Sequence, residues 1–220
     1  LWVSLFAILF ALPFGLSVSI YMSEVANPKV RSWLKPIIEL LSGIPSVVYG
    51  FFGLIVIVPL IQKLFDLPVG ESGLAGSVVL AIMALPTIIT VTEDAMRNCP
   101  RAMREARLAL GASQWQTIYK VVIPYSISGI TSGVVLGIGR AIGETMAVLM
   151  VTGNAAVIPT TILEPLRTIP ATIAAELGEA PAGGPHYQAL FMLGVVLFFI
   201  TLIINFSVEY ISSKGLKRSK

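Results

Sequence analysis

The sequence predicts an all-α protein, a polytopic membrane helical bundle. Hydrophobic residues make up 55% of the 220 residues and charged residues only 12%, roughly half the charged share of a soluble domain. A chain with so little polar surface cannot cover an exterior that faces water, but it can cover one that faces lipid. Five apolar runs are also long enough to cross about 30 Å of hydrocarbon as helices.

The five expected spans follow these runs in order and form one transmembrane domain over residues 1–220. They lie at about 1–22, 42–64, 73–92, 125–151 and 187–208. Prolines inside several spans are compatible with membrane helices, because neighbouring helices and waters satisfy the carbonyls that proline frees. The chain begins with Leu1 inside an apolar run, with no basic segment before it. We therefore expect a truncated N-terminus rather than a signal peptide, and one further helix would give six spans.

The distribution of Lys and Arg predicts the orientation. The connections 23–36 and 93–124, together with the tail after Val208, hold twelve Lys and Arg, whereas the connections around 65–72 and 152–186 hold two. Basic connections stay in the cytoplasm, so we expect a multi-pass protein of the cell membrane with a cytoplasmic C-terminus. The tail cations that set this expectation are Lys214, Lys217, Arg218 and Lys220. The net charge of +3 then reflects topology and does not indicate nucleic-acid binding.

Two charged residues lie near the middle of the fourth expected span. Arg140 and Glu144 are four residues apart, so on a continuous helix they share one face and can pair. A charge at that depth costs about 2.5–3.5 kcal/mol, and a helix that faces lipid does not retain two. Five glycines in 129–143 favour close helix packing. The pair is either structural or part of a substrate pathway, and an arginine fork suits a tetrahedral oxyanion.

The cytoplasmic connection 93–124 predicts two short helices at an angle. The first is expected at about 100–110, ending at Gly111, a residue that favours a left-handed helix stop. The second is expected from Ser113, a suitable N-cap, to about Val121, stopping before Pro124. Such a loop either sets topology only or presents a rigid surface to a cytoplasmic partner.

The outer connection 152–186 contains a further apolar stretch, Ile169 to Leu177, that predicts a short helix on or in the outer surface. The connection either packs as a lid or docks an extracytoplasmic partner. Cys99 and His186 are the single residues of their types, which leaves neither a disulfide nor a cluster for a metal or catalytic site. We predict no cofactor and no enzymatic activity.

The cytoplasmic connection 93–124 also carries a sequence motif. Glu105-Ala106-Arg107, Gly111, and Ile123-Pro124 resemble, with matching spacing, the cytoplasmic loop of ABC importer permeases. Arg107 stands where that family usually has a second Ala. The resemblance implies that Glu105, Ala106, Gly111, Ile123 and Pro124 couple the membrane helices to an ATP-binding subunit. It also implies that the chain itself is not the ATPase.

Three further segments resemble the phosphate-type permeases of that family. They are RAIGETMAV (140–148), GIPSVVYGFFG (43–53), and LEPLRT with ATIAAE in the outer connection (163–168 and 171–176). Sulfate and molybdate permeases usually have a different sequence after the residue that corresponds to Glu144. The continuation Met146-Ala147-Val148 is more similar to one of the two sister permeases of the phosphate system than to the other.

The resemblance implies a path for inorganic phosphate formed with a sister permease, two ATP-binding subunits and an extracytoplasmic phosphate-binding protein. Arg140 and Glu144 would line that path. Three alternatives remain: a sulfate or molybdate permease, a passive channel or membrane assembly factor, and a membrane-embedded enzyme.

Overall fold

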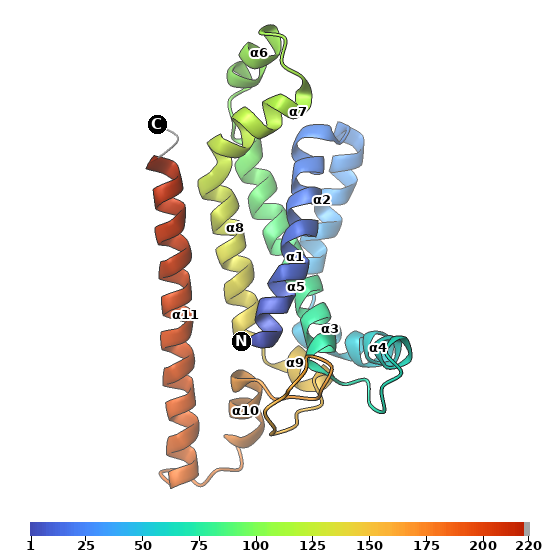
Figure 1. Cartoon of the computed structure of the whole chain (residues 1–220), viewed down its shortest axis with the longest axis vertical. Helices are drawn as coiled ribbons and strands as arrows, with labels where there is room; N and C mark the ends of the chain where they lie inside the picture. Colours follow the sequence, from blue (N-terminus) through green and yellow to red (C-terminus); the bar gives the residue numbers. More distant parts are fainter. Residues whose placement is uncertain (218–220) are drawn as a thin grey trace. The chain divides into compact units, whose positions relative to one another are not determined.

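The computed structural model describes the backbone of residues 1–217 and the side chains of residues 1–208 and Tyr210. The described chain is helical apart from its connections and one isolated bridge (Figure 1), which confirms the predicted fold class. Three π-helical segments, labelled η, interrupt the α-helices. In order, the elements are α1 (Trp2–Ile20), η1 (Tyr21–Val25), α2 (Pro28–Ser42), α3 (Ser46–Phe52), η2 (Gly53–Ile57), α4 (Val58–Leu64), α5 (Gly73–Arg97), α6 (Arg101–Ala109), α7 (Gln114–Thr117), η3 (Ile118–Val122), α8 (Ile123–Gly143), α9 (Met146–Val151), α10 (Ile169–Glu176) and α11 (Pro185–Lys217).

Within the described residues, five helical segments are long and apolar enough to cross a membrane. They are Trp2–Val25, Ser46–Leu64, Gly73–Arg97, Gln114–Gly143 and Pro185–Val208. Four of them lie within a few residues of the expected spans. The fourth runs earlier along the chain than expected, because α7, η3 and α8 are continuous and α8 ends at Gly143. The tail cations Lys214, Lys217, Arg218 and Lys220 lie outside the described side chains.

The chain divides into two compact units, and α1, α5, α8 and α11 each contribute residues to both. Unit 1 comprises Leu1–Ala11, Gly43–Ala84 and Ile138–Ile204. Unit 2 comprises Leu12–Ser42, Leu85–Gly137 and Asn205–Lys220.

An extensive apolar core holds unit 1 together. Its centre contains Val3, Val58, Met83, Val148 and Val151, all at most 5% exposed, so it joins α1, α4, α5 and α9. Burying side chains of this size stabilises a fold by about 1.5–3 kcal/mol each. The short helices α3 and α9 pack closely because Gly50 has no side chain. A Cβ at Gly50 would lie 2.9 Å from the backbone Cα of Ala147.

The connection after α9 closes the first turn of α5 in unit 1. A helix begins with four N–H groups that lack partners within the helix. Here the amides of Gly73 and Leu74 donate to the carbonyl oxygens of Glu164 and Ile162 at 3.1 and 2.8 Å. The expected outer helix is present as α10, Ile169–Glu176.

In the described part of unit 2 there are two small apolar clusters, one around Met96, Cys99 and Val122 and the other around Met22 and Ile38. Close helix contacts supplement them. The glycines of α8 at positions 129, 133 and 137 lie one turn apart and face α5, where a Cβ would crowd Ala95, Thr92 and Ile88. This confirms the predicted close approach for three of the five glycines, whereas a Cβ at Gly139 or Gly143 would meet nothing within 4 Å.

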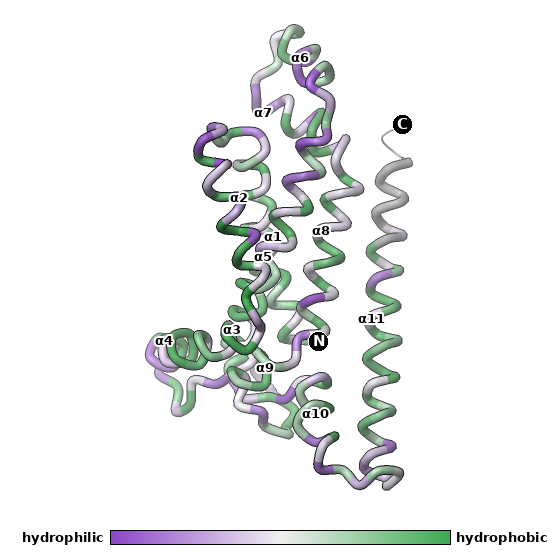
Figure 2. Tube along the Cα trace, turned by 180° about the vertical axis from the view of Figure 1, so that it is seen from behind, coloured by the Kyte–Doolittle hydropathy of each residue, from purple (hydrophilic) through white to green (hydrophobic). Residues whose placement is uncertain are grey.

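The outward surfaces of the long helices are apolar. Figure 2 shows hydrophobic colouring along most of α11, and Phe191, Phe198 and Phe206 on this helix are exposed. An exposed apolar helix surface of this extent fits contact with lipid or with another membrane helix.

Candidate functional site

The fourth long helix is interrupted at the predicted pathway residues. Arg140 lies in the last turn of α8, which ends at Gly143, and Glu144 and Thr145 precede the short helix α9. The Oε1 atom of Glu144 accepts hydrogen bonds from the amides of Thr145 and Ala147 at 3.1 and 3.4 Å. The Glu144 side chain therefore lies over the start of α9, whose N-cap residue is Thr145, and the helical spacing that led us to expect one shared face does not apply at this break.

Two of the carbonyls at the end of α8 accept hydrogen bonds from side chains in unit 1. The last four carbonyls of a helix lack partners within it. The Ser4 hydroxyl donates to the carbonyl of Ala141 at 3.1 Å, and the Thr145 hydroxyl donates to that of Gly143 at 3.3 Å. Side chains thus provide donors for two of the carbonyls that the interruption leaves free.

The two charged residues at this break lie beside a buried tyrosine and a small cavity. Arg140 is partly buried and interacts electrostatically with Tyr49, a buried residue of α3. Glu144 borders a small cavity of about 20 Å³, to which Thr168 and Pro170 also contribute. Arg140 and Glu144 therefore both lie in unit 1, next to the element boundary between α8 and α9.

The 93–124 connection forms the two short helices that the sequence predicts. Glu105 and Ala106 lie on α6, with exposed side chains. Gly111 follows in the left-handed conformation with φ +81°, which a residue with a side chain adopts at a cost. Its amide donates to the carbonyl of Leu108 at 2.9 Å, so the helix ends where expected.

A capping box begins the second helix. The Gln116 amide donates to Ser113 Oγ at 3.3 Å, and the Ser113 amide donates to Gln116 Oε1 at 3.0 Å, which confirms Ser113 as the N-cap. The expected stop before Pro124 is absent. The helix instead continues through Pro124, which lies two residues after the π-helical turn η3. Local π-helical geometry is one of the adjustments that let a membrane helix contain a proline.

The α6–α7 connection exposes an apolar surface. The large side chains that it leaves in solvent are Met103, Leu108, Leu110, Trp115 and Tyr119. Leu110, beside the Gly111 turn, is 81% exposed. Exposed apolar groups on an otherwise polar connection are typical of a protein interaction surface.

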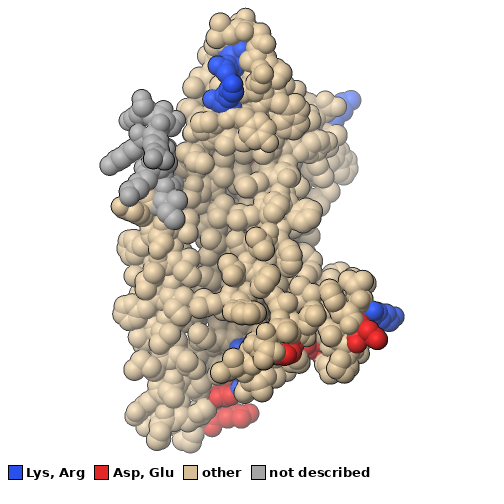
Figure 3. All heavy atoms as spheres, in the orientation of Figure 1, with Lys and Arg blue, Asp and Glu red and all other residues tan. Residues whose placement is uncertain are grey.

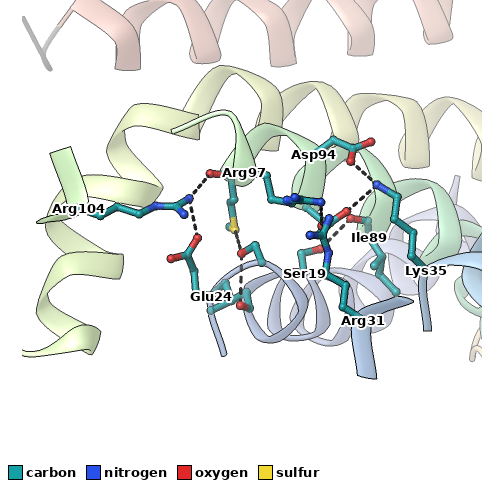
Figure 4. A network of polar contacts seen from close by, with 12 residues as sticks. Ser19, Glu24, Arg31, Lys35, Ile89, Asp94, Arg97 and Arg104 are labelled. Carbon is teal, nitrogen blue, oxygen red and sulfur yellow. Dashed lines mark hydrogen bonds and ion pairs between the residues drawn. The ribbon is translucent and has the colours of Figure 1, made fainter. Parts of the chain in front are cut away.

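Sequence reasoning missed a buried charge cluster in unit 2 (Figure 4). The Glu93 side chain on α5 is only 1% exposed and forms ion pairs with Arg31 and Lys35 of α2, the latter at 3.0 Å. Lys35 also pairs with Asp94. The available signal was two adjacent carboxylates directly after an apolar run, in a chain whose nearby connection 23–36 holds three cations.

The partners of Lys35 change its titration. Partial burial of the ammonium group alone would lower the pKa of Lys35. The hydrogen bonds and charges of Asp94 and Glu93 outweigh that effect and raise its pKa above the ordinary value.

A second ion pair ties α6 to the rest of unit 2. Arg104 lies 2.9 Å from Glu24 of η1 and donates to the carbonyl of Met96 on α5 at 2.8 Å. Gln114 of α7 also donates to the Glu24 carbonyl at 2.8 Å. The exposed connection is therefore anchored to the ends of α1 and α5.

His186 has a partner that the sequence did not indicate. Glu176 at the end of α10 pairs with Arg167 and lies 3.2 Å from His186 Nε2. This cluster links α10 to the start of α11 within unit 1.

Long apolar helices and an exposed two-helix connection define a polytopic α-helical membrane protein. Residues 7–215 match the family described as "Binding-protein-dependent transport system inner membrane component", and the chain belongs to that family. It is a multi-pass inner membrane permease component of an ABC importer, and ATP hydrolysis lies on a separate subunit.

Relatives and solved structures agree with this family. The chain is 41% identical to "Probable ABC transporter permease protein YqgH" of Bacillus subtilis, covering 96% of this chain and 69% of that protein. It is 38% identical to "Phosphate transport system permease protein PstC" of Mesorhizobium japonicum, covering 94% and 69%. Its fold is similar to that of a chain in inward-facing structures of the MetNI methionine ABC transporter, with a TM-score of 0.74 at 19% identity over 97% of this chain and 91% of that one.

Proposed function

We propose that the chain is the permease subunit of an ATP-driven importer of inorganic phosphate, of the kind named PstC, and forms the translocation path with a sister permease. The observation that carries this proposal is the interruption of the fourth long helix at Glu144, with Arg140 in the turn before it. Non-helical backbone within a membrane protein is tolerated where it is buried in protein or lines a cavity.

The chemistry of the two side chains supports an oxyanion substrate. Arg140 offers a planar fork of donors that matches a tetrahedral oxyanion. The Glu144 carboxylate is fixed by two backbone amides, so its negative charge is held beside the same helix break. A fixed negative charge near the arginine weakens anion binding enough to permit release. Phosphate is favoured over sulfate or molybdate by relatives that carry the phosphate name at 35–38% identity.

The α6–α7 connection is the proposed contact with an ATP-binding subunit. Its exposed side chains around Leu108 and Leu110 supply apolar surface. The positive φ of Gly111 and the capping box at Ser113 fix the angle between the two helices. The ion pair of Arg104 with Glu24 connects this surface to α1, so movement of the connection would be passed to a long helix.

The orientation follows from charge. Unit 2 holds twelve of the fifteen Lys and Arg, and we propose that its connections and the C-terminus face the cytoplasm. The connection with α10 would then face the extracytoplasmic phosphate-binding protein.

The test is uptake of radiolabelled phosphate by vesicles that hold the full complex, with sulfate and molybdate as competitors. We expect ATP-dependent phosphate uptake by the wild type and a fall of at least tenfold with Arg140→Gln, since loss of a charge-assisted contact of about 1.5–3 kcal/mol corresponds to that range. Lys63→Gln is the matched control, because it removes an exposed basic side chain of unit 1.

Each alternative gives a different result. Competition by sulfate or molybdate at low concentration would assign the chain to that kind of permease. Uptake without ATP would indicate a passive channel. Equal uptake by wild type and Arg140→Gln, with phosphate still the substrate, would remove Arg140 from the pathway while leaving the transport proposal intact.

A further inference from the structure

Unit 2 contains a cationic cavity that the proposed transport path does not use. It has a volume of about 620 Å³ and is bordered by η1, the first half of α2, the end of α5 and the helix α6. This volume falls within the roughly 300–1,000 Å³ of small-molecule sites. Five cationic side chains line it: Arg31, Lys35, Arg97, Arg101 and Arg104.

Carboxylates of unit 2 neutralise only part of this charge. Glu93 serves Arg31 and Lys35 and lies 4.0 Å from Arg97, Asp94 serves Lys35, and Glu24 serves Arg104. None of these three carboxylate residues borders the cavity. Five cations against three carboxylates leave an excess of two positive charges facing the open volume.

Some donors around the cavity also lack acceptors. Among the described residues, Arg101 has no ion pair, and the buried Nε atoms of Arg31 and Arg104 have no hydrogen-bond partner. A buried donor without an acceptor costs about 1–3 kcal/mol. An anion with several acceptor oxygens would satisfy these groups together. Figure 4 shows Arg104 of α6 beside Glu24, and Arg31 and Lys35 of α2 pointing toward α5.

The position of the cavity at the ends of two spans favours an anion that carries a phosphate group. Met22 and Ser23 lie near the end of the span Trp2–Val25, and Arg97 ends the span Gly73–Arg97. Ends of spans lie at the depth of lipid headgroups, and basic pockets beside membrane helices bind phosphate-bearing headgroups. Arginine forks also match the tetrahedral geometry of a phosphate group. Figure 3 shows basic side chains gathered over the α6 region of this unit.

We propose that this cavity binds a phosphate group, carried either by an anionic lipid or by free inorganic phosphate. The site is separate from Arg140 and Glu144 and does not depend on the substrate that the importer carries. Because Arg101 and Arg104 belong to the helix α6, an occupied site would fix α6 to the ends of α1 and α5.

The test uses the full complex in nanodiscs of phosphatidylcholine, with or without phosphatidylglycerol, and without ATP or binding protein. Two quantities are measured: retained phosphatidylglycerol by native mass spectrometry, and binding of radiolabelled inorganic phosphate by equilibrium dialysis. The test variants are Arg101→Gln and the double variant Arg97→Gln/Arg101→Gln. Arg101 has no ion pair among the described residues and the Arg97 side chain is 50% exposed, so both variants are expected to fold.

We expect the double variant to lose one of these ligands by about tenfold or more, since two charge-assisted contacts are removed. Lys29→Gln is the matched control, because Lys29 is an exposed cation of α2 outside the cavity, and it should change binding less than twofold. Loss of phosphatidylglycerol alone assigns the site to a lipid, and loss of inorganic phosphate alone assigns it to the free anion.

Three results would overturn the proposal. The first is unchanged binding of both ligands by the double variant. The second is an equal loss with Lys29→Gln, which would show a general effect of positive charge. The third is loss of the ATP-binding subunits from the double-variant complex in the same mass spectra while both ligands are retained, which would show that an acidic protein surface occupies the cavity.

Discussion

The two units of the chain are stabilised by different interactions. Unit 1 holds three Lys and Arg and six Asp and Glu, so its formal charge is −3, whereas unit 2 holds twelve and six, giving +6. Unit 1 has one large apolar core. Among its described residues, unit 2 has two small apolar clusters and ion pairs around Glu93 and Glu24. Electrostatic contacts thus contribute most where the chain also presents the exposed α6–α7 connection.

Substitution of Glu93 gives the strongest test of the role of ion pairs in unit 2. We expect Glu93→Gln to lower the free energy of unfolding by about 3 kcal/mol, because it leaves Arg31 and Lys35 without their shared carboxylate. The value lies at the low end for a buried pair, since these cations keep 16% and 27% of their side-chain surface exposed. Hydrogen exchange should show faster opening of α2 while the core of unit 1 stays protected.

Asp94→Asn is the control for that prediction. The Asp94 side chain is 53% exposed and makes one ion pair, so its loss should cost less than about 1 kcal/mol. Equal effects of the two substitutions, or equal loss of protection in both units, would contradict the distinction between them.

The packing of unit 1 gives the next largest effect. Gly50→Ala places a Cβ 2.8 Å from Met150 Sδ and 2.9 Å from the Ala147 backbone, and overpacking of this kind costs about 1–3 kcal/mol. Gly139→Ala meets nothing within 4 Å and should raise stability by up to about 1 kcal/mol through helix propensity. Thermal unfolding of both variants measures the difference, and a neutral Gly50→Ala would show that α3 and α9 are loosely packed.

The smallest effect concerns pH in the connection of unit 1. The Thr160 side chain and amide donate to Glu164, at 2.7 and 2.6 Å, and lower the pKa of that carboxyl. A carboxyl with a lowered pKa stabilises the fold above its unfolded value of 4.5 and loses that contribution as pH falls through the folded value. Exchange of the Thr160 amide, corrected for its intrinsic rate, should accelerate over that range in the wild type and stay constant in Glu164→Gln.

Local signals made most of the fold predictable. Apolar runs predicted the long helices. Gly111 predicted the end of α6, Ser113 predicted the start of α7, and the stretch from Ile169 predicted α10. Each of these depends on residues close together in the chain. The continuation through Pro124 was not predictable in this way, because the π-helical turn η3 just before it helps the helix to accommodate the proline, and no local residue pattern indicated that turn.

The parts of the site that the sequence did not predict depend on residues far apart in the chain. Glu93 is buried where Arg31 and Lys35 of another helix pair with it. The spacing of residues within either helix does not predict such a pairing. The break at Glu144 similarly depends on Ser4, which supplies a donor from another helix. The sequence identified Arg140 and Glu144 as chemically unusual but assigned them a continuous helix.

The closure of α5 by a later connection affects how the protein is made. The amides of Gly73 and Leu74 find their acceptors on Glu164 and Ile162, which the ribosome adds long after α5 has emerged. Until then, the start of α5 has exposed donors at the edge of the bilayer, where water or the insertion machinery must serve as their acceptor. The start of α5 therefore obtains its native hydrogen-bond partners only once residues 162 and 164 have been made, so a nascent chain halted before residue 162 would hold α5 without its native beginning.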